Sequence, residues 1–483
     1  MQLQVIFKII GLLLMLFSSS MLTPVIVDLI YQENDSIPFL MGFAVTFGSG
    51  LLLWYPVRHY RKELRLRDGF IVVVLFWTVL GLAGSIPLMF TLQPYMSFTD
   101  AVFESISGLT TTGATVITGL DNLPHAILFY RQQLQWLGGM GIIVLAVAVL
   151  PMLGIGGMSL YRAETPGPMK DTKLTPRLTE TAKALWYIYL SLTILCAISY
   201  WLAGMDVFDA ISHSFATIAI GGFSTHDASM GYFNSPVIEM VAVVFMLLAG
   251  VNFALHFVVW RSLNLGSYLK DSEFRTYITI LMIVSAITIG YLYLTDTFIE
   301  PMNAFHHGLF QAVSIGTTTG FTTAEYFVWP GFLPVLLLFV SFIGGCAGST
   351  GGGMKVIRFL LLLKQGKREI MKLIHPSAQI PIRMGGKSVS PGVIESVWGF
   401  FAAYVGIFSI MLLTLMMTGL DQISAFSAVA ASLNNLGPGL GEVGANYASI
   451  TDTAKWVLVF GMLMGRLEIF TLLVLLMPAF WRR

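Results

Sequence analysis

Long apolar stretches recur from one end of the chain to the other, and polar residues gather in the shorter stretches between them. A membrane-spanning helix needs about 20 mostly apolar residues, and by that criterion about ten stretches qualify as spans. They are residues 9–30, 38–56, 70–90, 127–153, 184–203, 236–260, 276–295, 331–363, 395–419 and 455–480. The pattern therefore predicts an all-α polytopic membrane protein.

The composition agrees with this prediction. Hydrophobic residues make up 56% of the chain and charged residues 11%, whereas a soluble domain usually carries about 25% charged residues. The first span lacks a clear small-residue cleavage site and the second follows closely, so we interpret it as a retained helix. Cys196 and Cys346 lie far apart in apolar surroundings, which is typical of small buried residues rather than of a disulfide or metal site.

Basic residues predict the orientation of the spans. Of the 27 Lys and Arg residues, all but three lie at the chain ends or in four stretches, residues 57–69, 161–183, 259–275 and 354–391. The alternate connections contain none: residues 31–38, 91–126, 204–235, 296–330 and 420–454. Because basic loops stay cytoplasmic, we expect both termini to lie inside. The three exceptions sit at or within spans and are Arg131, Lys455 and Arg466.

Four of the outside connections contain a short apolar segment that ends in a polar, glycine-bearing turn. They read DAVFESISGLTTTGAT (100–115), DAISHSFATIAIGGFST (209–225), HGLFQAVSIGTTTGFT (307–322) and SAFSAVAASLNNLGPG (424–439). Aligned on Gly113, Gly222, Gly320 and Gly437, they recur at intervals of roughly 100 residues, longer than any solenoid repeat. The recurrence predicts four copies of one unit: a span, a short helix, a glycine turn and a second span.

The short segments are too short to cross a bilayer, so we interpret them as re-entrant. Non-helical backbone at membrane depth is tolerated only where it is buried in protein or lines water. Four such turns can converge on an axis where backbone carbonyls replace the hydration shell of a cation. Glycine permits positive φ, and each short helix directs the negative end of its dipole inward. The alternative is that each turn is a helix cap or a packing notch.

This interpretation predicts an ion selectivity filter that binds its ion through the backbone. Side-chain ligation is not expected, because Ile220 and Leu436 have no side-chain oxygen. The predicted filter residues are Thr111, Thr112, Gly113, Ile220, Gly221, Gly222, Thr318, Thr319, Gly320, Asn435, Leu436 and Gly437.

The stretches FESISGLTTTGAT, HSFATIAIGGFSTHDAS, FIGGCAGSTGGG and LNNLGPGLG resemble signatures of the Trk/Ktr/HKT superfamily of potassium transporters. Over essentially its whole length the chain is similar to the bacterial TrkH-type membrane subunit of that superfamily. The resemblance implies an N-terminal helix pair, residues 1–56, followed by four parallel span–pore helix–span repeats around a pore. The repeats would comprise residues 57–160, 161–262, 263–365 and 366–483.

The resemblance also implies partners, a transported ion and a location. It implies a homodimer with a pore in each protomer, joined to a cytosolic TrkA-type nucleotide-binding regulatory ring. K⁺ would be the transported ion, and this chain itself would bind no nucleotide. The location implied is the bacterial inner membrane, and membrane lipid is an expected partner, whereas nucleic acid is not.

A glycine-rich segment interrupts the apolar stretch 331–363. Each glycine inside a helix costs about 1 kcal/mol relative to alanine, so the segment predicts a broken helix. A phosphate-binding loop requires G-x-x-x-x-G-K-[ST] after a strand, but Met354 follows Gly353 and no strand precedes it. The resemblance implies an intramembrane gating loop, and a packing kink is the alternative. Its residues are Gly344, Gly345, Cys346, Ala347, Gly348, Ser349, Thr350, Gly351, Gly352 and Gly353.

Arg466 lies within the apolar stretch KWVLVFGMLMGRLEIFTLLVLL. An intramembrane charge usually faces the protein interior, a cavity or a partner. Glu468 is two residues away and does not share the helix face of Arg466, so the partner of Arg466 is expected on another element. The resemblance places a basic residue of the fourth repeat beside the pore, near the gating loop, where it would raise the barrier to cations. A structural ion pair is the alternative.

The remaining ionisable residues give weaker signals. His213, His306 and His307 lack metal-ligand spacing, so capping or packing is the expected role. The basic stretch 354–391 is expected to dock a soluble partner or to meet anionic lipid. Five acidic residues near the predicted outer mouth would attract cations, unless they are simply solvated: Asp100, Glu104, Asp209, Asp227 and Asp421.

The patterns predict a cation-conducting membrane protein that is not an enzyme, and the resemblance implies potassium-selective uptake across the bacterial inner membrane. No nucleophile–base or metal set is found at membrane depth. A cation-coupled secondary transporter is the main alternative. Such transporters usually show inverted or paired repeats, whereas this chain shows four parallel copies.

Overall fold

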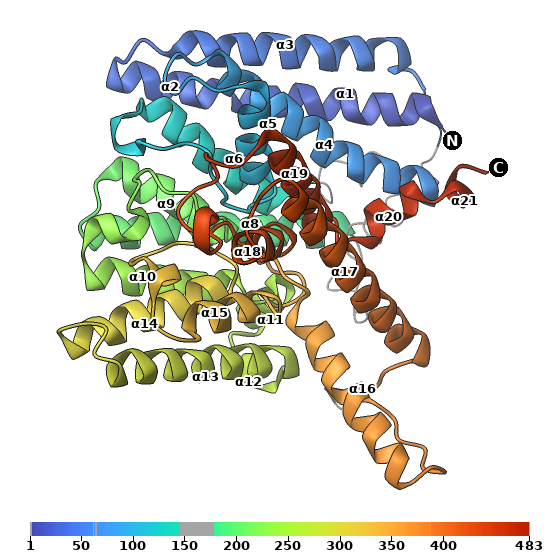
Figure 1. Ribbon diagram of the computed structural model, residues 1–483. Helices are drawn as coiled ribbons and strands as arrows, with labels where there is room; N and C mark the ends of the chain where they lie inside the picture. The colour runs from blue at the N-terminus through green and yellow to red at the C-terminus, as the bar shows by residue number, and fades with distance from the viewer. Residues whose placement is uncertain (1, 61, 63–64, 145–177, 386, 483) are drawn as a thin grey trace.

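The computed structural model describes residues 2–60, 62, 65–144, 178–385 and 387–482. Helices make up almost all of its regular structure, as Figure 1 shows. The described residues form one small sheet, an antiparallel pair of β1 (Arg383–Met384) and β2 (Lys387–Ser388). The prediction of an all-α polytopic membrane protein is therefore confirmed.

Six of the ten predicted spans correspond to long helical stretches. Six stretches in the described part of the chain are long and apolar enough to cross a membrane. The first combines α1 and α2. The helices are α1 (Leu3–Ser20), α2 (Leu22–Tyr31), α3 (Ser36–Trp54), α4 (Leu66–Phe90), α8 (Leu178–Leu202), α13 (Ser272–Leu294) and α17 (Pro391–Met417).

Two further spans are sharply bent pairs of helices. α10 (Pro236–Ala249) and α11 (Phe253–Ser262) meet at 94°, and α19 (Asp452–Arg466) and α20 (Phe470–Leu476) meet at 115°. Counting each pair as one span gives up to eight spans in the described residues, fewer than the sequence predicts.

Two predicted spans account for the difference. Within 127–153, helix α6 (His125–Val144) is described, whereas residues 145–153, most of the inside stretch 161–183 and the predicted boundary at residue 160 lie outside the described residues. Within 331–363, α15 (Leu333–Ser341) and α16 (Val356–Ile374) are separated by the glycine-rich segment. Six glycines in ten residues leave too little helix propensity for a continuous span.

Four short helices precede the four glycine turns, and we call them the pore helices: α5 (Phe98–Leu109), α9 (Val207–Ala219), α14 (Pro301–Gly316) and α18 (Gln422–Leu433). Ser97, Asp206 and Asp421 cap α5, α9 and α18 by accepting backbone N–H bonds, while Pro301 opens α14. All four are buried over most of their length. The structure therefore places short helices where the sequence predicts re-entrant segments.

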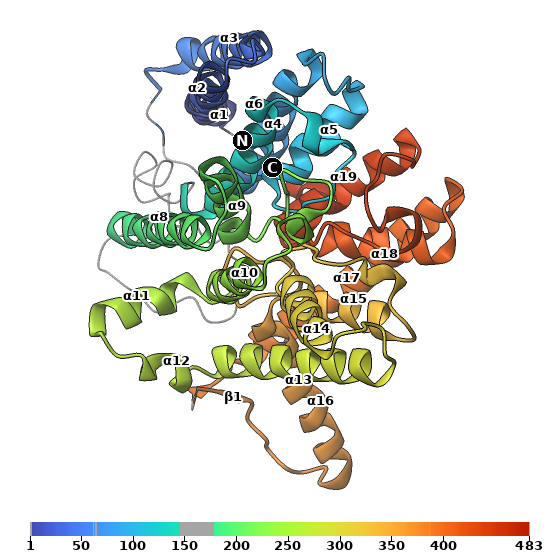
Figure 2. The ribbon, with the colours of Figure 1, turned by 90° about the vertical axis from the view of Figure 1, so that its left-hand side faces the viewer.

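Helices of the four predicted repeats surround a common centre in the end-on view of Figure 2. α4–α6 lie at the top, α8–α10 at the left, α13–α15 below and α17–α19 at the right. Helices α1 and α3 pack on each other and against α4, and both termini lie at the same end of the molecule (Figure 1). The described residues also form the short helices η1 (Tyr55–Val57), η2 (Leu120–Asn122), η5 (Ser229–Phe233), α12 (Gly266–Lys270), η6 (Tyr326–Val328), η7 (Gly441–Val443) and α21 (Pro478–Trp481).

Candidate ion-conducting site

The four pore helices end with the same backbone hydrogen bonds. At each end, one N–H donates to the carbonyl three residues earlier, and the next N–H donates to the carbonyl five residues earlier at 2.8 Å. This pair of bonds defines a Schellman helix end, in which one residue turns left-handed. Those four left-handed residues are Thr111, Ile220, Thr318 and Asn435.

A second left-handed residue follows two positions later, and it is the aligned glycine of each copy. The φ values are 81° at Gly113, 76° at Gly222, 86° at Gly320 and 95° at Gly437. The same two positions therefore have positive φ in all four copies. Left-handed backbone costs roughly 1–2 kcal/mol at a non-glycine residue, and such strain persists only where the surrounding structure enforces it.

Each aligned glycine packs against the next copy of the turn. A Cβ atom added to any of the four would lie within 3.0 Å of a carbonyl oxygen of the following copy, a separation that real Cβ atoms essentially never show. The pairs are Gly113 with Gly221, Gly222 with Thr319, Gly320 with Leu436, and Gly437 with Thr112. These contacts close a ring of four turns, residues 111–113, 220–222, 318–320 and 435–437, which we call the filter ring. Both the φ angle and the lack of space require glycine at the four aligned positions.

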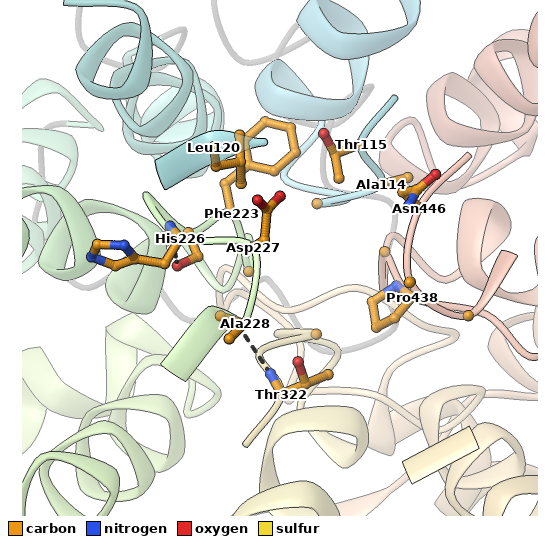
Figure 3. Close-up of a pocket in the computed structure, with 18 of the residues that line it drawn as sticks. Ala114, Thr115, Leu120, Phe223, His226, Asp227, Ala228, Thr322, Pro438 and Asn446 are labelled. Carbon is orange, nitrogen blue, oxygen red and sulfur yellow. Dashed lines mark hydrogen bonds between the residues drawn. The ribbon is translucent and has the colours of Figure 1, made fainter. Parts of the chain in front are cut away.

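The filter ring opens into a cavity of about 580 Å³ that is lined by its four glycines and by the residues that follow them. Figure 3 shows that residues from all four copies surround this cavity, with the carboxylate of Asp227 pointing into it. Asp227 is held there because its Oδ1 accepts the N–H of Gly119 at 3.0 Å. The carboxylate is placed to attract cations to this mouth.

The other four predicted mouth carboxylates do not line this cavity. Glu104 is fully buried and pairs with Arg131 at 2.8 Å, and Asp100 pairs with Lys455 at 2.6 Å. Both acids lie on α5, whereas Arg131 comes from α6 and Lys455 from α19. A buried carboxylate needs such a partner because an unpaired charge is costly to desolvate.

Asp421 is the N-cap residue of α18. Asp209 belongs to a cluster at the rim of the cavity that also contains His226 and Asp121. The ring of His226 stacks on Tyr232, its Nδ1 lies 2.6 Å from Asp121 and its Nε2 lies 3.1 Å from Asp209. Burial opposes the charged form of His226, but the hydrogen bonds to Asp209 and Asp121 outweigh it and raise the pKa of the ring.

Two of the histidines noted in the sequence make local contacts. His213 bonds the hydroxyl of Ser224, and His307 bonds the hydroxyl of Thr323. Among the described residues, no three His, Cys, Asp or Glu side chains are grouped to hold a metal ion. Both cysteines are unpaired and buried, as expected.

The glycine segment, residues 344–353, lies against the inner ends of three pore helices. A Cβ atom on Gly352 would overlap the carbonyl oxygen of Asn434, so the segment lies directly against the end of α18. Its hydrogen bonds join Thr350 Oγ1 to the carbonyl of Ile218 at 2.9 Å, the N–H of Gly352 to Thr318 Oγ1 at 2.7 Å, and the N–H of Gly353 to the carbonyl of Asn434 at 3.0 Å. The segment thus lies on the side of the filter ring away from the cavity.

Arg466 connects the glycine segment to the first copy. It is 9% exposed, and it donates to the carbonyl of Thr350 at 3.2 Å and to the carbonyl of Gly138 at 2.7 Å. Both acceptors lie outside α19, as expected because Glu468, the nearest acid in sequence, does not share the helix face of Arg466. Glu468 instead pairs with Arg358 of α16, at the break between α19 and α20.

Sequence reasoning missed Glu273, which lies in the first turn of α13. Its Oε1 accepts the N–H of Ala347 at 2.7 Å and the N–H of Ile357 at 3.2 Å. One carboxylate therefore ties the glycine segment to the first turn of α16. The available signal was an acidic residue at the start of an apolar span, just after a basic inside stretch.

Comparison with known proteins agrees with this architecture. The family model described as TrkH, cation transport protein, matches residues 36–483. Proteins named Trk system potassium uptake protein TrkH are 60% identical in Vibrio parahaemolyticus and 54% identical in Escherichia coli, each over the whole of both chains. The crystal structure of the potassium transporter TrkH from Vibrio parahaemolyticus matches with a TM-score of 0.92 at 58% identity, again covering both chains completely. The chain is a multi-pass membrane protein that belongs to the TrkH family of cation transport proteins.

Proposed function

We propose that this chain takes up K⁺ across the bacterial inner membrane through the filter ring. The observation that carries the proposal is the closed ring of four glycine turns, each with the same two left-handed residues. The substrate is supported by relatives of 54% to 60% identity that are named potassium uptake proteins. Asp227 supplies the attraction that brings cations to the cavity above the ring.

The ion ligands in this proposal are the backbone carbonyls of the twelve filter residues. Repeated positive φ turns successive carbonyls toward one side of the chain, as a ring that replaces a hydration shell requires. The pore helices direct the negative ends of their dipoles at the same place. The ring therefore combines partial negative charge from the carbonyls and from the helix ends without any ionised ligand.

We assign the gate to the glycine segment, residues 344–353, together with Arg466. The segment lies across the inner ends of the pore helices, and Arg466 adds a positive charge at the same level. Movement of the segment would remove both obstacles. α16 follows the segment directly and carries the first part of the basic stretch 354–391, to which a cytosolic partner would bind.

The partners in this proposal are a second copy of the chain, membrane lipid and a TrkA-type nucleotide-binding ring on the cytoplasmic side. Both termini and the basic loops face that side. The chain acts without enzymatic chemistry and without a bound nucleotide of its own. The competing function is a cation-coupled secondary transporter, in which flux requires a second ion.

Ion flux into liposomes that contain the purified protein tests the proposal. We expect passive K⁺ flux that exceeds Na⁺ flux and needs no gradient of a second ion. Strict dependence on a second ion would support the coupled transporter instead. A crystal soaked in Rb⁺ or Tl⁺ should show density on the axis of the filter ring, and density elsewhere only would contradict the ligand assignment.

A further inference from the structure

Helix α6 carries two buried polar side chains on one face, Arg131 and Gln135, which we call the α6 polar pair. They are one helical turn apart, so they lie on the same side of the helix. Arg131 is 1% exposed and Gln135 is fully buried. α6 follows the first glycine turn in the chain, yet both side chains reach the second turn.

Arg131 binds the chain segments that follow the first and second turns. Its Nη2 donates to Thr115 Oγ1 at 3.1 Å, and its Nη1 donates to the carbonyl of Ser224 at 3.0 Å. Its guanidinium carbon lies 4.4 Å from the centre of the Phe223 ring. Glu104 balances the charge and accepts the N–H of Val116 at 3.0 Å.

Gln135 holds the filter ring itself. Its Nε2 donates to the carbonyl of Gly221 at 2.6 Å, while its Oε1 accepts the N–H of Phe223 at 3.0 Å. The carbonyl of Gly221 is also the atom that a Cβ on Gly113 would strike. The α6 polar pair therefore fixes the junction between the first and second turns at the ring and just outside it.

The other junctions of the ring are tied differently. The N–H of Gly231 donates to the carbonyl of Thr322 at the second junction, and the hydroxyl of Tyr326 donates to the carbonyl of Gly439 at the third. These bonds lie outside the filter residues. At the fourth junction Asn435 Nδ2 donates to Thr112 Oγ1 at 2.9 Å, so two filter residues are joined there through their side chains rather than through a carbonyl. Tyr447 donates to the carbonyl of Gly437, but both belong to the fourth copy.

We propose that the α6 polar pair is a specificity-determining element, which sets the spacing and the carbonyl direction between the first two turns. The inference rests on the proposed function. A carbonyl oxygen has two lone pairs, so Gly221 can accept the bond from Gln135 and still face an ion. The bond keeps that carbonyl from moving inward around a smaller cation, and it lowers the field that the oxygen offers, which favours K⁺ over Na⁺.

The test compares K⁺ and Na⁺ flux into liposomes for Gln135→Met and Arg131→Lys. Met fills a similar volume without a donor, and Lys keeps the charge but loses the fork that reaches two strands. We expect the K⁺/Na⁺ ratio to fall by about tenfold in Gln135→Met and by less in Arg131→Lys. Total cation flux should change less than the ratio does, because the path itself remains open.

Lys455→Met provides the matched control. Lys455 is also a buried cation in a span that pairs with an acid of α5, but its acceptors, Asp100 and the carbonyl of Ala448, lie away from the filter ring. The control should keep the parent's K⁺/Na⁺ ratio even if its thermal stability falls.

Several outcomes would overturn the inference. Both α6 variants could conduct with the parent's ratio, the control could lose discrimination equally, or both α6 variants could fail to fold while the control folds, which would show a purely structural role. A parent protein that conducts K⁺ selectively in those experiments leaves the proposed function intact. A parent without selective K⁺ flux contradicts the proposed function first.

Discussion

The filter ring and the glycine segment are both glycine-rich, non-helical backbone within apolar surroundings, yet they are built differently. The ring repeats one geometry four times, and each of its glycines is packed against a carbonyl of the next copy. The segment occurs once. Its glycines also pack closely against carbonyl oxygens, as Gly352 does against Asn434, but its hydrogen bonds run to separate elements that include α9, α13, α18 and α19. In the ring each turn is constrained by a neighbouring turn on both sides. The hydrogen bonds of the segment go to separate elements, so they can break one at a time.

The difference predicts opposite responses to mutation. A change in the filter ring should impair ion discrimination, because its strained backbone exists only while all neighbours enforce it. A change in the glycine segment should raise flux, because it removes one bond that holds an obstacle in place. The following predictions test this contrast, from the largest expected effect to the smallest.

Gly113→Ser should have the largest effect. The residue has a φ of 81°, and its Cβ would strike the carbonyl of Gly221. If displacement of that carbonyl costs at least about 1.4 kcal/mol of discrimination, the K⁺/Na⁺ flux ratio falls tenfold or more. The ratio should fall further than total flux, and isotope uptake into liposomes measures both.

Gly119→Ser separates lack of space from backbone strain. Gly119 has a similar φ of 74°, but nothing lies within 4 Å of the position of its Cβ. This variant should keep the parent's ion ratio. If both variants lose discrimination equally, backbone strain rather than the closed ring explains the result.

Arg466→Ala should raise flux in the absence of any cytosolic partner. The substitution removes a positive charge below the filter ring and the bonds to Thr350 and Gly138. Deletion of several of residues 346–351 should act in the same direction, while the K⁺/Na⁺ ratio stays near that of the parent. Flux equal to that of the parent in both variants would identify the segment as a packing kink.

Recurrence explains why the filter ring could be predicted from the sequence. Four copies of one pattern carry their own alignment, so Ile220 could be aligned with Thr111, and Leu436 with Thr112, without any structure. The glycine segment was recognisable because glycines break helices wherever they cluster. Neither prediction required knowledge of which elements are neighbours.

The residues that hold these features could not be predicted, because their partners are distant in sequence. Arg131 and Lys455 were only exceptions to the charge pattern, and their acids, Glu104 and Asp100, looked like members of a solvated cluster. Gln135 and Glu273 lack a repeated counterpart that would draw attention to them. Contacts between single residues that are distant in sequence depend on the tertiary structure, so they cannot be predicted from one sequence.

Glu273→Ala should raise partner-free flux by less than Arg466→Ala. It removes the acceptor of two N–H bonds at the glycine segment and α16, but it leaves the positive charge of Arg466 in place. Glu273→Gln keeps an oxygen acceptor in the same position and should conduct close to the parent level. If Gln and Ala raise flux equally, the carboxylate charge rather than the hydrogen bonds holds the segment.

The smallest effect is expected at the outer rim, where His226 joins Asp121 of the first copy to Asp209 of the second. Because the folded protein raises the pKa of His226 above its ordinary value of 6.5, the charged ring stabilises the fold fully below that pH. The contribution is lost as the pH rises through the higher, folded pKa. For a partly buried cluster at the rim, it should amount to roughly 1 kcal/mol or less. Raising the pH from about 6 to about 8 should therefore lower the thermal unfolding temperature of the parent more than that of His226→Gln. An identical pH response in the two proteins would show that the rim, unlike the filter ring, does not depend on the contact between these two copies.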